Sequence, residues 1–316
     1  MNIGFIGAGR WGSVLINHLA KRENIIFVYD KNIVPEKFKK RNIKVLKDLK
    51  GIKDCSVILL TVPSYSLREI LKELKEIIKK QKTIFVSGIK GIEENSLKRM
   101  SEIIYEYFPK NPIAVLCGPG IPEEVALGIP TTLVIACKDR EIGEKLQKLL
   151  SFDNIRVYYQ DDIIGCEIGG AIKNVIAIAS GILDGKNFGI NTKSALISRG
   201  LAEIMRLGIK LGALPLTFAG LSGVGDLIVT CFSKYSRNYQ LGFALGKGEK
   251  LEEFLRKEKG VIEGYHTAKT IYQLKDKYKV EMPICEGIYQ ILFLKRDINE
   301  VIQKLLKRSL KEEFWQ

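Results

Sequence analysis

The chain has 316 residues, 46% of them hydrophobic, which is enough for two domains that each bury a core. The formal charge of +14 comes from lysines spread along predicted helices, which favours solvated helix faces and attraction of phosphorylated ligands over nucleic-acid binding. Six scattered cysteines and two histidines offer neither a disulfide framework nor a zinc site, so we expect reduced structural thiols and no metal.

Short apolar runs alternate with amphipathic helical patterns through the first half of the chain. This alternation predicts a mostly parallel sheet with helices on both faces. The predicted strands are Asn2–Ile6, Ile25–Tyr29, Cys55–Val62, Thr83–Val86, Ile113–Leu116, Thr131–Cys137 and Ile155–Tyr159. The predicted helices between them are 10–22, 64–80, 94–107, 121–128 and 139–150.

From about residue 162 the strand patterns stop and only helical ones follow. The predicted helices are 162–184, 191–212, 236–246, 250–258, 262–278, 283–294 and 297–308. The predicted fold class is therefore α/β, with a Rossmann-like domain at 1–161 followed by an all-helical, substrate-binding domain at 162–316. A ligand cleft is expected where the two domains meet.

The run 163–183 is long and apolar enough to resemble a membrane span. Its glycines and the polar residues Glu167, Lys173 and Asn174 favour a buried helix of a soluble protein, without membrane insertion. The chain starts directly with a strand pattern and lacks a basic leader, so we expect a cytoplasmic protein.

Lys173 is the most informative residue of that run, because it projects from a strip of small residues that includes Gly169 and Ser180. The strip leaves room for a ligand, and burial would lower the pKa of the lysine toward neutrality, as proton transfer requires. The alternative is a lysine that extends from a core helix to solvent. The helix alone does not separate these two interpretations.

A dinucleotide-binding fingerprint, Gly7, Gly9 and Gly12, directly follows the first strand and opens a helix. The glycines serve the turn, the backbone approach to a pyrophosphate and close helix packing, and the helix N-terminus favours the anion. Asp30 ends the second strand, where an acid binds the adenosine ribose, which slightly favours NAD over NADP. Lys31 beside it is able to attract a 2′-phosphate instead.

Pro63 lies just after a central strand, where it either flanks the nicotinamide or simply ends the strand. Three further clusters suggest a substrate site. Lys90 lies between glycines after another strand, and Asp226 begins a helix, which an N-cap alone would explain. Arg237 also opens a helix, where it suits a phosphate. Together with the nucleotide fingerprint, these clusters indicate a reductase of a small phosphorylated ketone.

In order along the chain, the motifs GAGRWG, VPS, KGIE, GPG, GGAIKN, GVGDLIVTC, SRN and VIEGY resemble those of the bacterial NAD(P)-dependent glycerol-3-phosphate dehydrogenases. The resemblance runs nearly end to end and implies reversible reduction of dihydroxyacetone phosphate to sn-glycerol 3-phosphate for phospholipid synthesis. It implies that Lys173 is the catalytic acid and base, that Lys90 contacts substrate and cofactor, and that Asp226 orients Lys173. Lys90 and the nicotinamide would lower the pKa of Lys173, whereas Asp226 would raise that pKa. The sequence does not decide which of these opposing effects is larger.

The resemblance also assigns the remaining site residues. The implied substrate contacts are Lys90, Gly118, Gly120, Lys173, Asn174, Asp226, Thr230, Ser236, Arg237 and Asn238. The cofactor contacts expected from the fingerprint and the strand ends are Gly7, Gly9, Gly12, Asp30 and Pro63. To these the resemblance adds Arg10, Trp11, Lys31, Lys90, Pro122, Arg237, Val261 and Glu263.

Two positions depart from the family pattern. Gly120 replaces a usual Ser or Thr, and Asp30 replaces a residue that is often small. Two other functions remain open: a reductase of ketopantoate or of a β-hydroxy acid, which the phosphate-binding Arg237 disfavours, and a non-catalytic NADH sensor, which would not need Lys90 or Lys173. The apolar helical domain makes a homodimer the expected assembly.

Overall fold

The computed structural model describes residues 1–32 and 35–313, except for the side chain of Lys37. The chain divides into two compact units. The first unit contains Met1–Glu93 and Lys98–Glu167, and the second contains Glu94–Leu97 and Ile168–Gln316.

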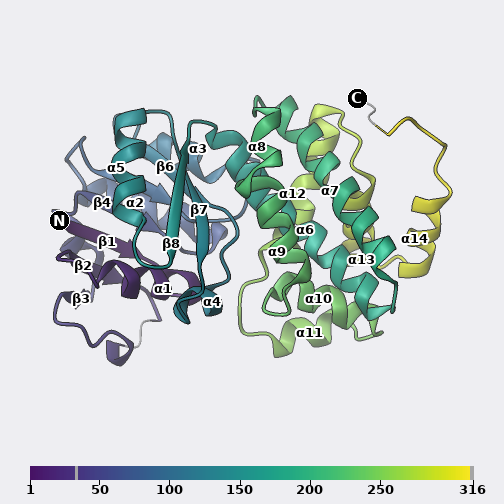
Figure 1. Ribbon diagram of the computed structural model, residues 1–316, viewed down its shortest axis with the longest axis horizontal. Coiled ribbons are helices and arrows are strands. Elements are labelled where there is room, and N and C mark those ends of the chain that lie inside the picture. The colour runs from purple at the N-terminus through teal and green to yellow at the C-terminus, as the bar shows by residue number, and fades with distance from the viewer. Residues whose placement is uncertain (33–34, 314–316) are drawn as a thin grey trace. The chain divides into compact units, whose positions relative to one another are not determined.

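The first unit is built on an eight-stranded sheet in the order β3-β2-β1-β4-β5-β6-β7-β8 (Figure 1). Its strands are β1 Asn2–Ile6, β2 Ile25–Tyr29, β3 Ile43–Val45, β4 Val57–Leu60, β5 Ile84–Ser87, β6 Ile113–Cys117, β7 Thr131–Cys137 and β8 Ile155–Gln160. Neighbouring strands are parallel except for β6 and β7, which are antiparallel. The predicted mostly parallel Rossmann-like sheet is confirmed.

Helices cover both faces of this sheet. The described helices of the unit are α1 Arg10–Leu19, α2 Leu67–Ile77, α3 Met100–Tyr107, α4 Pro122–Ala126 and α5 Arg140–Leu150, with short 3-10 turns at Pro35–Lys37, Leu49–Ile52 and Ser64–Ser66. Successive strand residues point to opposite faces. Phe5 accordingly packs in the core beneath α1 and α5, whereas Ile6 packs beneath α2 and α3.

Two strand predictions were inaccurate. The edge strand β3 was missed, because three residues are too few to give a clear alternation. The predicted strand Cys55–Val62 is shorter in the structure and covers Val57–Leu60, since only these residues pair with both β1 and β5.

The helix predicted at 94–107 was wrong in its first half, because α3 begins only at Met100. Arg99 is extended, and its backbone N–H donates to the Glu102 carboxylate at 2.8 Å, which caps the helix. Arg99 also forms an isolated bridge with Ile92. Residues 88–99 therefore form a folded-back loop after β5.

The second unit is helical in its described part. Its helices are α6 Ile163–Gly185, which begins in the first unit, then α7 Ile190–Lys210, α8 Pro215–Ala219, α9 Asp226–Phe232, α10 Arg237–Gly246, α11 Leu251–Lys257, α12 Glu263–Tyr278, α13 Pro283–Leu294 and α14 Ile298–Leu306. A π-helical segment, Leu221–Gly225, leads into α9. The segment from α8 through this π-helix was not among the predicted helices, since its glycines obscure the helical period.

The long helix α6 is long and apolar enough to cross a membrane by composition, yet 94% of its apolar window is buried inside the protein. The expected buried core helix is confirmed. Its first turns are fixed within the first unit by Glu167, which accepts hydrogen bonds from the Ser101 backbone N–H at 2.7 Å and from Arg99 at 2.6 Å. Burial raises the pKa of Glu167, and these donors oppose that rise.

At Gly169 the predicted strip of small residues on α6 is filled by protein, and so is the space beside Gly181, which lies outside that strip. A Cβ atom at Gly169 would lie 2.5 Å from the backbone oxygen of Ser222, and one at Gly181 would lie 2.1 Å from that of Tyr239. The glycines instead allow the backbone of the π-helical segment and of α10 to pack directly on α6. At these two positions the space is filled by protein.

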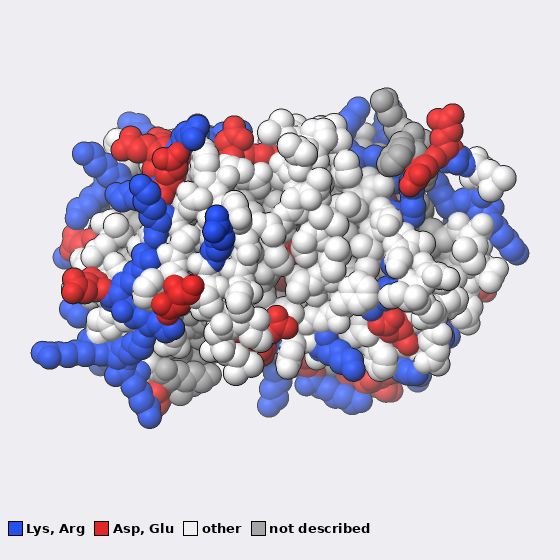
Figure 2. Space-filling view, viewed as in Figure 1, with Lys and Arg blue, Asp and Glu red and all other residues white. Residues whose placement is uncertain are grey.

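All six cysteines are free and buried, as expected for structural thiols. Burial raises the pKa of Cys55 and of Cys231 to about 12, so both thiols stay protonated. Among the described residues, no cluster of His, Cys, Asp and Glu has the arrangement of a metal site. On the face drawn in Figure 2, acidic side chains lie among the lysines and arginines of the first unit.

Candidate active site

The glycine turn between β1 and α1 has the geometry of a dinucleotide-binding loop. Gly7 has a φ of +100°, and a Cβ atom there would lie 2.6 Å from the Thr61 backbone oxygen. A Cβ atom at Gly12 would lie 2.2 Å from the Gly7 oxygen, whereas one at Gly9 would have open space around it. Gly9 is also the N-cap of α1 and provides no side-chain cap. The open approach to this helix N-terminus fits an anionic pyrophosphate.

Asp30 supports the turn directly. Its carboxylate accepts hydrogen bonds from the Ala8 backbone N–H at 2.6 Å and from the Asn32 backbone N–H at 2.8 Å. Each carboxylate oxygen can accept a further bond, so these contacts are compatible with the predicted ribose contact. Lys31 beside it is exposed, and its Nζ lies 3.7 Å from the Glu69 Oε2.

Trp11 brings three sequence motifs together within the first unit. A Cβ atom at Gly120 would lie 3.0 Å from the Trp11 ring, and one at Gly88 would lie 3.7 Å from its Nε1. The glycine turn, the loop after β5 and the loop after β6 thus meet at this indole. The Trp11 ring fits closely here because residue 120 has no side chain.

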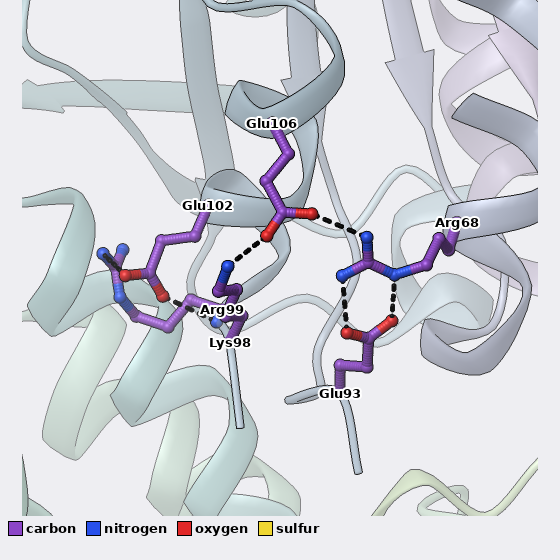
Figure 3. A network of polar contacts seen from close by, with 6 residues as sticks. All are labelled: Arg68, Glu93, Lys98, Arg99, Glu102 and Glu106. Atoms are coloured by element: carbon purple, nitrogen blue, oxygen red, sulfur yellow. Dashed lines mark hydrogen bonds and ion pairs between the residues drawn. The ribbon is translucent and has the colours of Figure 1, made fainter. Parts of the chain in front are cut away.

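The other predicted residues of this unit lie on adjoining loops. Arg10 begins α1, and its Nε donates to Glu123 at 2.7 Å. Pro63 precedes a 3-10 turn, Pro122 is the first residue of α4, and Gly118 has a φ of +108°. Lys90 is half-buried in the loop after β5. A network of ion pairs centred on Arg68 lies beside this loop (Figure 3).

Lys173 is 4% exposed and does not reach solvent, so the alternative of a solvent-directed lysine is wrong. Its ammonium group donates to the carboxylate of Asp226 and to Thr230 Oγ1, the latter at 2.8 Å. Asp226 is fully buried at the start of α9, and it does not cap that helix, whose N-cap is Gly225. The structure thus joins three residues from two sequence motifs into one buried polar cluster.

A second polar cluster lies where α10 meets the loop before α12. Asn238 donates to the Asn174 side chain at 3.0 Å and accepts from the Gly264 backbone N–H at 2.9 Å. Arg237 donates to the backbone oxygen of Val261 at 3.0 Å. Because Asn174 follows Lys173 on α6, the second unit links the two clusters through one helix.

The ends of these elements position the second cluster. Ser236 caps α10 by accepting a hydrogen bond from the Tyr239 backbone N–H, and Glu263 begins α12. Sequence reasoning missed Gly260. A Cβ atom there would lie 2.4 Å from the Arg237 guanidinium carbon, so only glycine lets the guanidinium lie against this loop. In the sequence, the position of Gly260 directly before the VIEGY motif was the signal that could have pointed to it.

Comparison with known proteins now identifies the family. Residues 2–143 match the family domain described as the NAD-dependent glycerol-3-phosphate dehydrogenase N-terminus, and residues 162–303 match the corresponding C-terminus. The chain belongs to the NAD-dependent glycerol-3-phosphate dehydrogenase family. The resemblance found in its sequence motifs is confirmed.

Curated relatives in this family align with nearly the whole length of the chain. The glycerol-3-phosphate dehydrogenase (NAD(P)+) of Bacillus subtilis is 44% identical over 327 residues, which cover 98% of this chain and 94% of the relative. That of Clostridium tetani is also 44% identical, over 98% of this chain and 93% of the relative. Both names identify NAD(P)-dependent oxidoreductases.

A solved glycerol-3-phosphate dehydrogenase from Coxiella burnetii has the same fold, with a TM-score of 0.92, 32% identity, and coverage of 97% of this chain and 99% of that one. A ketopantoate reductase from Ralstonia eutropha aligns with a TM-score of 0.59 at 11% identity, over 97% of this chain and 100% of that one, which shows a related fold alone. The ketopantoate alternative therefore gains no functional support from this likeness.

Proposed function

We propose that the protein catalyses the reversible, NAD(P)H-dependent reduction of dihydroxyacetone phosphate to sn-glycerol 3-phosphate, which serves phospholipid synthesis. The observation that carries this proposal is the buried cluster of Lys173, Asp226 and Thr230. It lies in the helical domain of a glycerol-3-phosphate dehydrogenase and is linked through α6 to the arginine and asparagine at the start of α10.

Lys173 is the proton donor in this proposal. When bound, the nicotinamide cofactor supplies the hydride that is added to C2 of the ketone. Lys173, as an ammonium, gives a proton to the ketone oxygen, and the reverse reaction returns that proton to the amine. Asp226 and Thr230 fix the orientation of the ammonium group, because both accept its hydrogen bonds from buried positions. Lys90 contacts substrate and cofactor and stabilises the negative charge that develops on the oxygen.

The substrate phosphate is bound at the start of α10. Arg237 offers charge-assisted hydrogen bonds, and Asn238 and Ser236 present polar groups at the same helix N-terminus. Backbone groups of Gly118 and Gly120 complete the set of substrate contacts, since residue 120 has no side-chain hydroxyl to offer. These contacts favour a phosphorylated ketone over ketopantoate or a β-keto acid.

The cofactor would be held by the glycine turn, by Trp11 and by the loop that carries Val261 and Glu263. We propose that Asp30 makes NAD the preferred form, because a carboxylate repels a 2′-phosphate. Replacing Asp30 by Ser should lower the ratio of kcat/KM for NADH to that for NADPH by about tenfold or more, equivalent to ~1.4 kcal/mol. An unchanged ratio would show that Asp30 serves only the turn.

We further propose a cytoplasmic homodimer. Exposed apolar side chains of the second unit support the assembly, among them Leu216, which is 82% exposed, and the exposed Leu214, Ile228 and Phe232. Light scattering of the purified protein gives the mass that tests this assembly.

One assay tests the reaction against its alternatives. Oxidation of NADH and of NADPH is followed with dihydroxyacetone phosphate, ketopantoate and a β-keto acid in parallel. Oxidation with dihydroxyacetone phosphate alone is expected. Preferred oxidation with one of the other two substrates would overturn the proposal, and binding of NADH without any oxidation would indicate the sensor.

A further inference from the structure

The loop that carries Lys90 is held by a network of ion pairs in which Arg68 is the central residue (Figure 3). Arg68 lies in the first turn of α2. Its Nε and Nη2 donate to the two carboxylate oxygens of Glu93 at 2.8 and 2.7 Å, and its Nη1 donates to Glu106 at 2.6 Å. The two parallel bonds to Glu93 form a fork that fixes both the distance and the orientation of that carboxylate.

Glu93 lies three residues after Lys90, at the base of the folded-back part of the loop. Here the Glu93 backbone N–H donates to the Lys98 oxygen at 3.0 Å, and Ile92 bridges to Arg99. Residues 88–99 contain no helix or strand, so the loop between β5 and α3 lacks the repeating backbone hydrogen bonds of such elements. The fork therefore ties the base of the loop to the more rigid helix α2.

The Glu93 side chain is only 16% exposed, whereas that of Arg68 is 32% exposed. An ion pair at this depth contributes modestly to stability, since solvent screens the arginine. Its geometric effect is larger, because a displacement of about 1 Å of a catalytic group can reduce turnover about 100-fold. The network is thus better suited to placing a side chain than to holding the fold together.

We propose that Arg68 is a positioning residue that acts through Glu93 to hold Lys90 against the substrate. The inference rests on the role of Lys90 in the proposed function. What is new is that the side chains of Arg68 and Glu93 position the loop that carries Lys90. Neither Arg68 nor the carboxylate of Glu93 touches the reacting atoms in this proposal.

The test is a double-mutant cycle on kcat/KM for dihydroxyacetone phosphate with the full-length protein. Arg68→Ala and Glu93→Ala should each lower kcat/KM by about 10- to 100-fold, and Arg68→Lys should be nearly as impaired because an ammonium cannot form the fork. In a Lys90→Ala background, Arg68→Ala should change kcat/KM less than about twofold, since the residue it positions is gone. Single-turnover oxidation of bound NADH replaces steady-state rates where the variants are slow.

Arg140→Ala is the matched control. It removes an exposed ion pair on α5, in which the Arg140 Nε donates to Glu144 at 2.8 Å outside the Arg68 network, and it should keep kcat/KM within about twofold of wild type. Thermal melting of every variant reports the fold, and Arg68→Lys takes the place of Arg68→Ala in the cycle if the alanine variant unfolds.

The possible failures are distinguishable. Absence of turnover in the wild-type protein would overturn the proposed function itself, and a fully active Lys90→Ala variant would overturn the role of Lys90 and the inference with it. Equal losses from Arg68→Ala in the wild-type and Lys90→Ala backgrounds would overturn the inference alone, because the arginine would then act independently of Lys90.

Discussion

The ammonium group of Lys173 and the carboxylate of Asp226 form an ion pair in which the side chains are 5% and 1% exposed. A pair buried this deeply costs desolvation energy at both partners, and its removal one partner at a time leaves an uncompensated charge. Single and double variants therefore separate what this pair contributes to folding stability from what Lys173 contributes to turnover.

Lys173→Met should abolish turnover and lower the free energy of unfolding by about 3–5 kcal/mol, because it leaves the Asp226 carboxylate buried without its cation. The double variant Lys173→Met/Asp226→Asn should regain most of that stability and remain inactive. Urea unfolding measures the stability, NADH fluorescence measures cofactor binding, and steady-state assays measure turnover. If either variant kept more than about a tenth of wild-type kcat, an effect below ~1.4 kcal/mol, Lys173 would not be the proton donor.

Arg237→Ala should raise KM for dihydroxyacetone phosphate about 100-fold, or ~2.7 kcal/mol, because a charged hydrogen-bond partner of the phosphate is lost. The activity with unphosphorylated dihydroxyacetone, measured at high concentration, should change little. Arg256→Ala is the control, since Arg256 is an exposed arginine on α11. Equal losses with both substrates would show that Arg237 does not recognise the phosphate.

Alanine at Gly9 and at Gly12 should have different effects. Gly12→Ala should lower the melting temperature and NADH affinity together, since its Cβ atom would lie 2.2 Å from the Gly7 oxygen. Gly9→Ala should melt like the wild type, because its Cβ atom meets open space, and should still weaken NADH binding about tenfold or more, ~1.4 kcal/mol. Unchanged NADH affinity in Gly9→Ala would place the pyrophosphate elsewhere.

Glu203 on α7 should make stability depend on pH. It is fully buried and accepts backbone hydrogen bonds from Ile284 and Cys285 at the start of α13, at 2.6 and 3.0 Å. Burial raises its pKa from 4.5 to about 7, against the opposing effect of these bonds. The folded protein therefore holds the proton more tightly than the unfolded chain, and this contribution to stability is complete below pH 4.5 and lost as pH rises through about 7.

Between pH 4.5 and 8, the wild-type protein should lose up to about 3 kcal/mol more unfolding free energy than Glu203→Gln, which has no proton to lose. Urea unfolding at several pH values measures both slopes. Parallel slopes would show that the backbone donors keep Glu203 charged at all these pH values.

Local patterns were sufficient for much of the fold. Alternating strands and helices, and the glycine turn after β1, follow from periodicity and from backbone requirements that act within a few residues. The extended start of the 94–107 segment did not follow from such patterns, because the bonds of Arg99 to Glu102 and Glu167 override its helical propensity.

The sequence by itself determined the fold class, the family and the identity of Lys173 as the unusual residue of α6. Only the tertiary structure decided that this lysine is buried against Asp226 and Thr230, and that Gly169 of α6 packs against neighbouring backbone. It also decided that Arg68 forms a bidentate ion pair with Glu93. The physical reason is range: helical period and turn chemistry act locally, whereas the hydrogen bonds of Lys173 and of Arg68 join residues 25 to 57 positions apart that meet only when the chain has folded.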